Sequence, residues 1–414
     1  EGLIRLAEAT SVYGIINLGT GHAHRVSEIV HKLQSKFPNL VVNHAESDIA
    51  FEASCADITQ YKKLVGWQPE YDLERAITEI IEFEKTQKLE APEHNSRNRN
   101  VLVSSASGKV PLIRSIQTAA KKLHPEIKVF AGDISDSALT KYIADDFWLM
   151  PRTDDINVKN ILAGCQERGI NTIIPTRDGE LLFWSKNSDL FSKAGINIIV
   201  SSVETINNTL DKLLFSEVGG KLGLPIIPSY LEPVGNDLFV VKERFGAGSE
   251  MIGLKLDKAS AISHAQKLKQ PIFQPFMEGI EISVDAWADK NHRIKGLVLR
   301  KRNYVVNGES KVTTTFHDSK LEEIFKKILE SFAFRGPVVL QAIIDDTGNP
   351  HIIEINARIG GASTAGIAAG LDSWYWSLLE SENADISQYP FILSNHEIRQ
   401  VRVPMDIHIY DSNL

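Results

Sequence analysis

Cysteine is nearly absent from this sequence, and long apolar stretches are missing. Its 414 residues contain two cysteines, Cys55 and Cys165, which excludes a disulfide scaffold and a zinc site built from cysteines. No apolar run approaches the ~20 residues needed to cross a bilayer, so we expect no membrane partner. Positive charge is also in deficit, because 45 Lys and Arg face 53 Asp and Glu, for a net charge of −8. This balance argues against a nucleic-acid partner held through phosphate contacts.

The remaining composition is that of an ordinary globular protein. Hydrophobic residues make up 43% of the chain and charged residues 24%. At roughly 100–200 residues per domain, the length accommodates two or three domains. The sequence starts at Glu1-Gly2 without a Met, and no basic and apolar leader follows. We therefore expect a cytoplasmic, multidomain enzyme whose sequence begins inside a longer reading frame.

Composition divides the chain into four stretches. Residues 1–87 end in a periodic helix over residues 72–83. Residues 88–98 contain almost no apolar side chains, which predicts an exposed linker. Residues 99–200 alternate short β-branched runs with helical stretches, which indicates βαβ units on a parallel sheet. In residues 201–414 the strands come in antiparallel-looking pairs, so this region is expected to be α+β.

Individual elements follow from the same periodicities. In the parallel region we expect a helix over Ile113–Leu123 between strands at Val101–Val103, Lys128–Phe130 and Thr172–Ile174. In the α+β region the expected strands are Leu238–Lys242, Gly253–Leu256, Glu281–Ala288, Arg293–Leu299, Val338–Ile344 and Pro350–Ile355. The last two flank Asp346-Thr-Gly-Asn349, a strong hairpin signal.

A glycine-rich turn, Phe245-Gly-Ala-Gly-Ser249, follows the strand that ends in Lys242. Small residues allow backbone N–H groups to close over a polyanion, and the lysine adds a positive charge. No Gly-Lys-Ser/Thr and no helix start follow, so the turn is not a P-loop. An ordinary tight turn would contain the same residues, and both interpretations stay open.

A second segment, Gln274-Pro-Phe-Met277-Glu278-Gly-Ile-Glu281, is extended and acidic. Its backbone could bind the edge of an adenine, and the Glu281 carboxylate could accept hydrogen bonds from ribose hydroxyls. An acidic loop between two strands is an equally good interpretation.

The third and sharpest pattern places Gln341 on one strand of a hairpin and Glu354-Ile-Asn356-Ala-Arg358 on the other. Alternate side chains of a strand share a face, so Glu354, Asn356 and Arg358 should point the same way. Oxygen ligands in this arrangement suit Mg²⁺, and an adjacent arginine could hold a phosphoryl or carboxylate group. A charged row on an edge strand is the alternative, and the flanking isoleucines disfavour it.

The order of these patterns, beginning at Asp211-Lys212, resembles the ATP-grasp superfamily over residues 99–395. Ser104–Leu112 and Pro175–Leu181 resemble in particular the carbamoyl phosphate synthetase-like carboxylate ligases. The resemblance implies a parallel-sheet pre-ATP-grasp domain followed by an ATP-grasp fold. The ATP-grasp fold would comprise a lid subdomain over about 205–271 and a metal-binding subdomain over about 272–395.

The resemblance also implies a role for each matching residue. Nucleotide binding would fall to Lys212, Lys242, Gly246, Gly248, Ser249, Gln274, Met277 and Glu281. The Mg²⁺ ligands would be Gln341, Glu354 and Asn356, and the catalytic arginines Arg358, Arg302 and Arg300. Many relatives have Asp or Glu where this chain has Gln341, so the number of metal ions stays open. For Arg300 and Arg302, a solvated basic run is as good an interpretation as a clamp for phosphate or substrate carboxylate.

The implied activity is that of an ATP-dependent carboxylate–amine or carboxylate–thiol ligase that acts through an acyl phosphate. Its cofactors would be ATP and Mg²⁺, with Mn²⁺ as a substitute, and its partners small-molecule carboxylates and amines, in a monomer or homodimer. No Ser-His-Asp or Cys-His set suggests a different chemistry. His317 is expected to be an ordinary surface histidine.

The N-terminal stretch resembles the C-terminal part of NAD-dependent sugar-nucleotide epimerase/dehydratases, through Asn17–Gly21, Val26–Val30 and Leu64–Pro69. Residues 1–90 contain no Gly-x-x-Gly-x-x-Gly fingerprint and no Tyr-x-x-x-Lys pair, so this chain alone should not bind NAD. We expect a truncated fusion whose ligase acts on an amino sugar or sugar nucleotide, and a vestigial docking domain is the alternative. Epimerase activity of the longer fusion and non-catalytic ATP binding are the other candidate functions.

Overall fold

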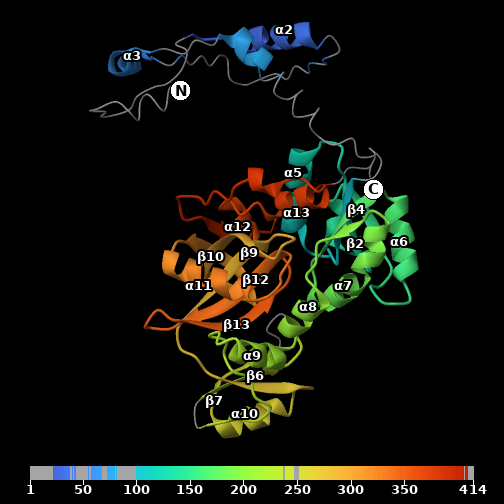
Figure 1. The fold of residues 1–414 in the computed structure, drawn as a ribbon, viewed down its shortest axis with the longest axis vertical. Helices are drawn as coiled ribbons and strands as arrows, with labels where there is room; N and C mark the ends of the chain where they lie inside the picture. The colour runs from blue at the N-terminus through green and yellow to red at the C-terminus, as the bar shows by residue number, and fades with distance from the viewer. Residues whose placement is uncertain are drawn as a thin grey trace. The chain divides into compact units, whose positions relative to one another are not determined.

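The computed structural model describes residues 22–37, 40, 42, 55, 57–67, 72–79, 81, 99–235, 238–246, 251–404 and 406–408. The chain separates into two compact units, Glu1–Asn95 and Ser96–Leu414 (Figure 1). The first unit contains α2 (Val26–Lys36), α3 (Thr59–Val65) and a helix over 73–79. The helix predicted over 72–83 is thus observed in its first part. Its end, the expected linker over 88–98 and the motif at 17–21 lie outside the described residues.

A five-stranded parallel sheet opens the second unit, with strand order β3-β2-β1-β4-β5. Its strands are β1 (Asn100–Ser104), β2 (Val129–Asp133), β3 (Asp146–Leu149), β4 (Ile170–Pro175) and β5 (Asn197–Ile198). The helices are α5 (Val110–Leu123), α6 (Val158–Glu167) and α7 (Asp178–Lys193), with the short helix η1 (Leu139–Tyr142). The three predicted strands and the predicted helix of this region are confirmed. Because the strand order reverses between β1 and β4, a crevice is expected at their carboxyl ends.

The second sheet is antiparallel and has six strands in the order β13-β12-β9-β10-β11-β14. They are β9 (Ile280–Ala288), β10 (Ile294–Val306), β11 (Glu309–Phe316), β12 (Gly336–Ile344), β13 (Pro350–Asn356) and β14 (Arg399–Val401). The elements around them are α11 (Ser319–Glu330), α12 (Thr364–Ala368), α13 (Ser373–Ser381) and η2 (Ile386–Gln388). The hairpin of β12 and β13 is confirmed, and β10 runs seven residues beyond its predicted end at Leu299.

A third, small sheet has the order β7-β6-β8. It comprises β6 (Phe239–Glu243), β7 (Gly253–Leu256) and β8 (Pro271–Pro275), with α10 (Lys258–Ala265) packed against it. The helices α8 (Val203–Leu210) and α9 (Lys212–Lys221) precede it in the chain. The predicted pairing of 238–242 with 253–256 is observed as β6 and β7.

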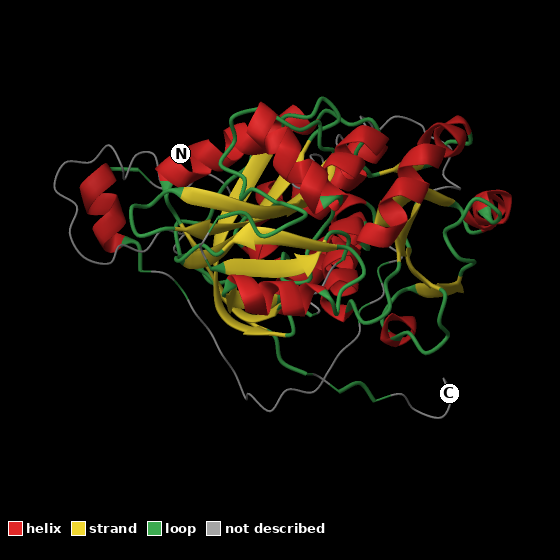
Figure 2. Ribbon diagram, turned by 90° about the horizontal axis from the view of Figure 1, so that it is seen from below, coloured by secondary structure: helices red, strands yellow, loops and turns green. Residues whose placement is uncertain are grey.

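The parallel and six-stranded sheets share their hydrophobic cores. One buried cluster joins Leu102 and Trp184 to Val284 and Leu340, so apolar residues of both sheets pack together. A second joins the α5 face to α13, and Figure 1 shows these two helices side by side. Figure 2 shows helices flanking the strands on both faces. No described helix has the length and hydropathy to cross a bilayer.

Candidate functional site

A cavity of about 1260 Å³ is lined by residues from all three sheets of the second unit. Lys109 and Asp178 reach it from the carboxyl edge of the parallel sheet, Lys242 from β6, Arg302 from β10 and Glu354 from β13. Small-molecule sites usually occupy about 300–1,000 Å³, so this cavity has room for more than one ligand.

The structure brings nearly all of the predicted site residues together around this cavity. Those in the described part of the chain all line it: Lys212, Lys242, Gly246, Gln274, Met277, Glu281, Arg300, Arg302, Gln341, Glu354, Asn356 and Arg358. Gly248 and Ser249 lie outside the described residues. His317 does not line the cavity and is 42% exposed, with its Nε2 2.9 Å from the carbonyl oxygen of Ser394.

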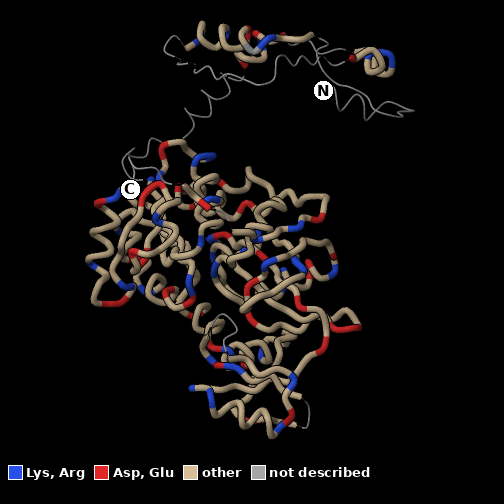
Figure 3. Tube along the Cα trace, turned by 180° about the vertical axis from the view of Figure 1, so that it is seen from behind, with Lys and Arg blue, Asp and Glu red and all other residues tan. Residues whose placement is uncertain are grey.

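The lining is positively charged although the chain as a whole is acidic. Among the described lining residues, ten are Lys or Arg and five are Asp or Glu. Figure 3, by contrast, shows the two signs interspersed along the trace of the second unit. A concave site with an excess of fixed positive charge attracts anions, because the low-dielectric walls concentrate its field.

Lys242 is the most deeply buried of the lysines that line the cavity. Its position on β6 leaves the side chain buried, and burial lowers the pKa of its ammonium from 10.5 to about 8. The neighbouring carboxylates of Glu354 and Glu281 act in the opposite direction, and the charge of Lys212 adds to the lowering. Since no described carboxylate forms an ion pair with this buried ammonium, it is a natural partner for an anionic ligand.

Lys212 is held by the start of α9. Asp211 caps this helix by accepting hydrogen bonds from the backbone of Leu213 and Leu214, and it forms an ion pair with Arg244 at 2.5 Å. The ammonium of Lys212 donates to the carbonyl oxygen of Gly246 at 2.9 Å. The helix start is therefore tied to the segment that follows β6.

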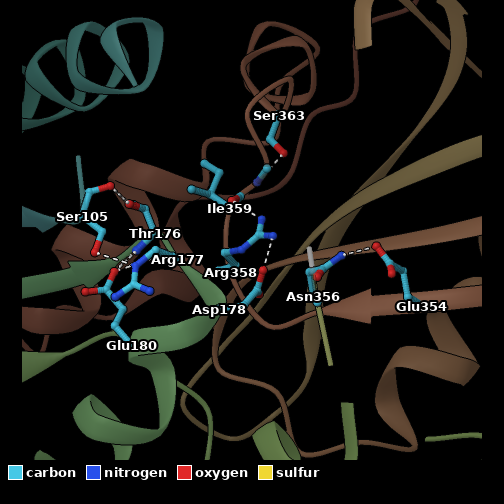
Figure 4. A network of polar contacts seen from close by, with 12 residues as sticks. Ser105, Thr176, Arg177, Asp178, Glu180, Glu354, Asn356, Arg358, Ile359 and Ser363 are labelled. Carbon is cyan, nitrogen blue, oxygen red and sulfur yellow. Dashed lines mark hydrogen bonds and ion pairs between the residues drawn. The ribbon is translucent and has the colours of Figure 1, made fainter. Parts of the chain in front are cut away.

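Glu354 and Asn356 share the cavity face of β13, as the strand period predicts. Both line the cavity, whereas Ile355 between them is buried. Asn356 donates from Nδ2 to Glu354 Oε1 at 3.1 Å, which leaves its carbonyl oxygen for a ligand; Figure 4 shows this contact. Gln341 lies opposite Glu354 on β12, and its amide, oriented by its neighbours, donates to the same oxygen at 2.5 Å.

These oxygens can hold one hard cation with the help of a ligand's own oxygens. No cluster of three His, Cys, Asp or Glu side chains placed for a metal occurs in the described part of the chain. Mg²⁺ is commonly bound by one or two protein carboxylates together with phosphate oxygens and water. The carboxylate of Glu354 and the amide oxygen of Asn356 fit such a partial shell.

Arg358 connects the two larger sheets. Its NH2 donates to Asp178 Oδ2 at 2.5 Å, and its NH1 donates to the carbonyl oxygen of Ile359 at 3.1 Å (Figure 4). The Nε atom of Arg358 and the Oδ1 atom of Asp178 are buried without a partner among the described residues. The guanidinium is thus fixed at the cavity wall with its Nε donor unused.

The side chains of Arg300 and Arg302 are only 3% and 8% exposed, so the interpretation as a solvated basic run is wrong for them. Arg300 forms a bidentate pair with Asp285, at 2.5 and 2.9 Å, and it also donates to Thr313. Ser363 donates to the same aspartate at 2.6 Å. Although Arg300 lines the cavity, its guanidinium is already occupied, which disfavours its predicted role as a substrate clamp.

Gln274 in β8 and Gly279 directly before β9 position the segment that connects these two strands. The Gln274 amide donates to Ser229 at 2.9 Å, so this buried side chain positions the neighbouring segment. Gly279 has φ of +153°, and a Cβ there would collide with the carbonyl oxygen of Ile344. Only glycine allows the backbone to approach β12 this closely.

Sequence reasoning missed the part of the site that comes from the parallel sheet. Lys109 uses all three of its donors on the Ser105 carbonyl, at 2.9 Å, and on the carbonyl and hydroxyl of Thr176, at 2.7 and 2.8 Å. Burial lowers the pKa of Lys109 to about 8. The sequence resemblance covers both segments, Ser104–Leu112 and Pro175–Leu181, but the strand-order reversal that brings them together is visible only in the structure.

Two family models match the second unit. Residues 267–403 match the family described as "ATP-grasp in the biosynthetic pathway with Ter operon". Residues 101–199 match "PylC-like, N-terminal domain". A search of curated protein sequences gives no match.

Several solved structures share the fold. The biotin carboxylase domain of Hydrogenobacter thermophilus 2-oxoglutarate carboxylase superposes with a TM-score of 0.60 at 19% identity, covering 74% of this chain and 75% of that one. The L-amino acid ligase of Bacillus licheniformis gives 0.58 at 15% identity, covering 75% and 82%. The N5-carboxyaminoimidazole synthetase of Staphylococcus aureus gives 0.56 at 18% identity, covering 70% and 81%.

These comparisons confirm the predicted fold class, a parallel-sheet domain followed by an antiparallel ATP-grasp domain. The expectation of an ATP-grasp enzyme is confirmed by the family model, since residues 267–403 match an ATP-grasp one. Neither family model reaches residues 1–87, so the epimerase resemblance still depends on the sequence pattern alone.

Proposed function

We propose that this chain is an ATP-dependent carboxylate–amine ligase that forms an acyl phosphate; a thiol is the alternative nucleophile. One observation supports the proposal above all others. The buried ammonium of Lys242, the Glu354–Asn356 oxygen pair and the fixed guanidinium of Arg358 converge on one positively charged cavity. Such a cavity suits a polyphosphate with its metal ion, because positioning and charge neutralisation supply most of the catalysis of phosphoryl transfer.

The nucleotide would bind between the small sheet and the six-stranded sheet. Lys212 and Lys242 would contact its phosphates, and Gly246 would cover them together with Gly248 and Ser249. The segment from Gln274 to Met277 would line the adenine pocket, and Glu281 would bind the ribose. Support comes from two of the similar structures, which contain ADP.

Mg²⁺, or Mn²⁺ in its place, would be held by Glu354 and Asn356 together with phosphate oxygens. When bound, the ion neutralises the charge of the phosphates and polarises the transferred group. The Hydrogenobacter structure contains the magnesium salt of ADP, which supports this choice of ion. Arg358, two residues beyond Asn356, would stabilise the phosphoryl group from the end of the same strand.

The reaction would proceed in two steps. A substrate carboxylate oxygen attacks the γ-phosphorus of ATP, the bond to the bridging oxygen breaks, and ADP leaves with the electron pair. An amine nitrogen then attacks the acyl carbon, the bond to the phosphate oxygen breaks, and phosphate leaves while the amine proton passes to solvent. The chain's own residues hold the reactants in line and exclude water, so no activated side-chain nucleophile is needed.

The second substrate would bind at the end of the cavity formed by the parallel sheet. Here charges of both signs lie together, with Lys109, Arg177 and Asp178 among the lining residues. A mixed lining suits a molecule that has both an anionic and a cationic group. The sequence resemblance of residues 1–87 adds an amino sugar or sugar nucleotide as the substrate class. We also propose a cytoplasmic homodimer, supported by the dimer in the Hydrogenobacter structure.

Calorimetric titration of the purified chain with MgATP, MgGTP and NAD tests this proposal. We expect Mg²⁺-dependent binding of ATP and none of NAD, followed by ADP release when acids and amines are screened together. Nucleotide binding without turnover for any acid–amine pair would favour a non-catalytic binding protein. The uncharged side chain of Gln341 is the feature that supports this alternative. Saturable NAD binding would favour the epimerase interpretation of residues 1–87.

A further inference from the structure

We propose that this site works with a single divalent cation, and that the guanidinium of Arg302 supplies the fixed positive charge of a second one. The inference depends on the proposed function, because it concerns the ions that accompany the nucleotide. It follows from the contacts of Gln341, which stands where many ATP-grasp relatives have Asp or Glu.

Gln341 brings no charge to the site and has no free ligand atom. Its amide nitrogen donates to Glu354 Oε1 at 2.5 Å, and its amide oxygen accepts from NH1 of Arg302. A carboxylate at this position would give a cation two anionic oxygens. The glutamine instead uses its one oxygen on an arginine, so a second metal ion would find no anionic ligand on β12.

Arg302 is held in place by two further contacts. Its Nε lies 3.3 Å from Glu281 Oε1, and its NH2 donates to the carbonyl oxygen of Gly308 at 2.9 Å. The side chain is 8% exposed, so the guanidinium cannot swing into solvent to make room for an ion. Because Arg is always protonated, this positive charge is permanent at every working pH.

No other described side chain offers itself as the missing ligand. Ser283, the partner of Gln341 on β9, is neutral, and Glu281 is already paired with Arg302. A divalent cation beside Gln341 would therefore meet a permanent positive charge at close range without a carboxylate to offset it. Glu354 and Asn356 remain as the place for one ion.

Arg302 is also well placed to replace what a second ion would do. It lines the cavity together with Glu354 and Gln341, and its side chain extends from β10 past β9 to Gln341 on β12. Arginine binds phosphate oxygens with two parallel donors, which gives both charge and orientation. Because Arg302 contacts Gln341, the two residues act as one unit. A variant that tests the inference should therefore substitute both of them.

Counting bound Mn²⁺ tests the inference independently of activity. The purified chain, in excess over the non-hydrolysable analogue AMP-PNP, is titrated with Mn²⁺, and free Mn²⁺ is measured by electron paramagnetic resonance. We expect one Mn²⁺ per bound nucleotide in the wild type, without the line broadening of two coupled ions. The double variant Gln341→Glu/Arg302→Gln should bind two.

The control Gln166→Glu repeats the charge change of Gln341→Glu on the exposed surface of α6, and its count should stay at one. Two Mn²⁺ per nucleotide in the wild type would overturn the inference and leave the nucleotide site intact. This count decides the question even if the double variant does not fold. A folded double variant that binds only one ion would overturn the role given to Arg302. A separate titration of AMP-PNP distinguishes these outcomes from failure of the proposed function, which would appear as no nucleotide binding at all.

Discussion

Asp178, the first residue of α7, and Arg358, just beyond the end of β13, form an ion pair with 2.5 Å between Oδ2 and NH2. The two residues are 180 positions apart, and neither is more than a fifth exposed. The pair connects the crevice at the carboxyl edge of the parallel sheet to the end of β13, the strand of the antiparallel sheet that carries Glu354 and Asn356. It thereby sets the distance between the two walls of the cavity.

Asp178→Asn should weaken this connection without unfolding the chain. Removing one partner of a partly buried charged pair costs about 1–3 kcal/mol of unfolding free energy, which urea denaturation can measure. We expect turnover to fall while the affinity for ATP stays nearly unchanged, because the lysines of the nucleotide end are untouched. Equal losses of affinity and turnover would contradict the separation of the two ends. A double-mutant cycle with Arg358→Gln isolates the coupling between the pair.

Lys242→Ala should weaken MgATP binding by roughly 10- to 100-fold, since a hydrogen bond to a charged group contributes about 1.5–3 kcal/mol. Lys159→Ala removes an exposed lysine of α6 and serves as the matched control. Calorimetric titration of both variants measures the effect. Unchanged affinity in Lys242→Ala would remove this residue from the nucleotide site.

The pKa of Lys242, about 8, predicts opposite effects of pH on binding and on stability. Affinity for ATP should fall as the pH rises above about 8, because the unliganded ammonium loses its proton. Stability should rise between about 8 and 10.5, because there the unfolded chain still binds a proton that the folded chain has released. Lys109 contributes in the same window, so Lys242→Met should reduce the slope and not abolish it. Denaturation and titration series over this range check both signs.

Glu354→Gln should remove the charged ligand for Mg²⁺ and lower Mg²⁺-dependent ADP release by about 100-fold or more, since metal polarisation is worth several kcal/mol. The fold should persist, because the glutamine keeps the size of the side chain. Glu167→Gln on the exposed end of α6 is the control, with turnover like that of the wild type. An active Glu354→Gln variant would show that the metal is held elsewhere.

Asp285→Ala should destabilise the fold by about 3–5 kcal/mol, because it leaves the buried charge of Arg300 without its partner. The hydroxyl of Ser363 loses its acceptor in the same variant. The exposed pair of Glu323 with Lys327 provides the comparison, since Glu323→Ala should leave the stability nearly unchanged. Replacing both partners, as in Asp285→Leu/Arg300→Met, should recover part of the loss. A small effect of Asp285→Ala would mean that Arg300 is free to act on a ligand.

The strands, and the face that Glu354 and Asn356 share, follow from local sequence alone. Period-two alternation predicted β9, and the hairpin turn at Asp346–Asn349 predicted β12 and β13. The strand period also determines that Glu354 and Asn356 lie on one face with Ile355 on the other. Backbone geometry is local, so residue type and spacing suffice to predict it. The order of the motifs along the chain indicated the ATP-grasp fold in the same way.

Only the tertiary structure decided which side chain each arginine pairs with. Arg300 and Arg302 are two residues apart on one strand, yet one is paired with Asp285 and the other with Glu281 and Gln341. The ion pair of Asp178 with Arg358, which joins two domains, was likewise decided by the tertiary structure. Ion pairs between distant segments depend on sheet register and domain packing, which bring together residues that no local pattern relates. The sequence therefore determined the elements and the residue types of the site, and the packing decided which of those residues remain free to bind a ligand.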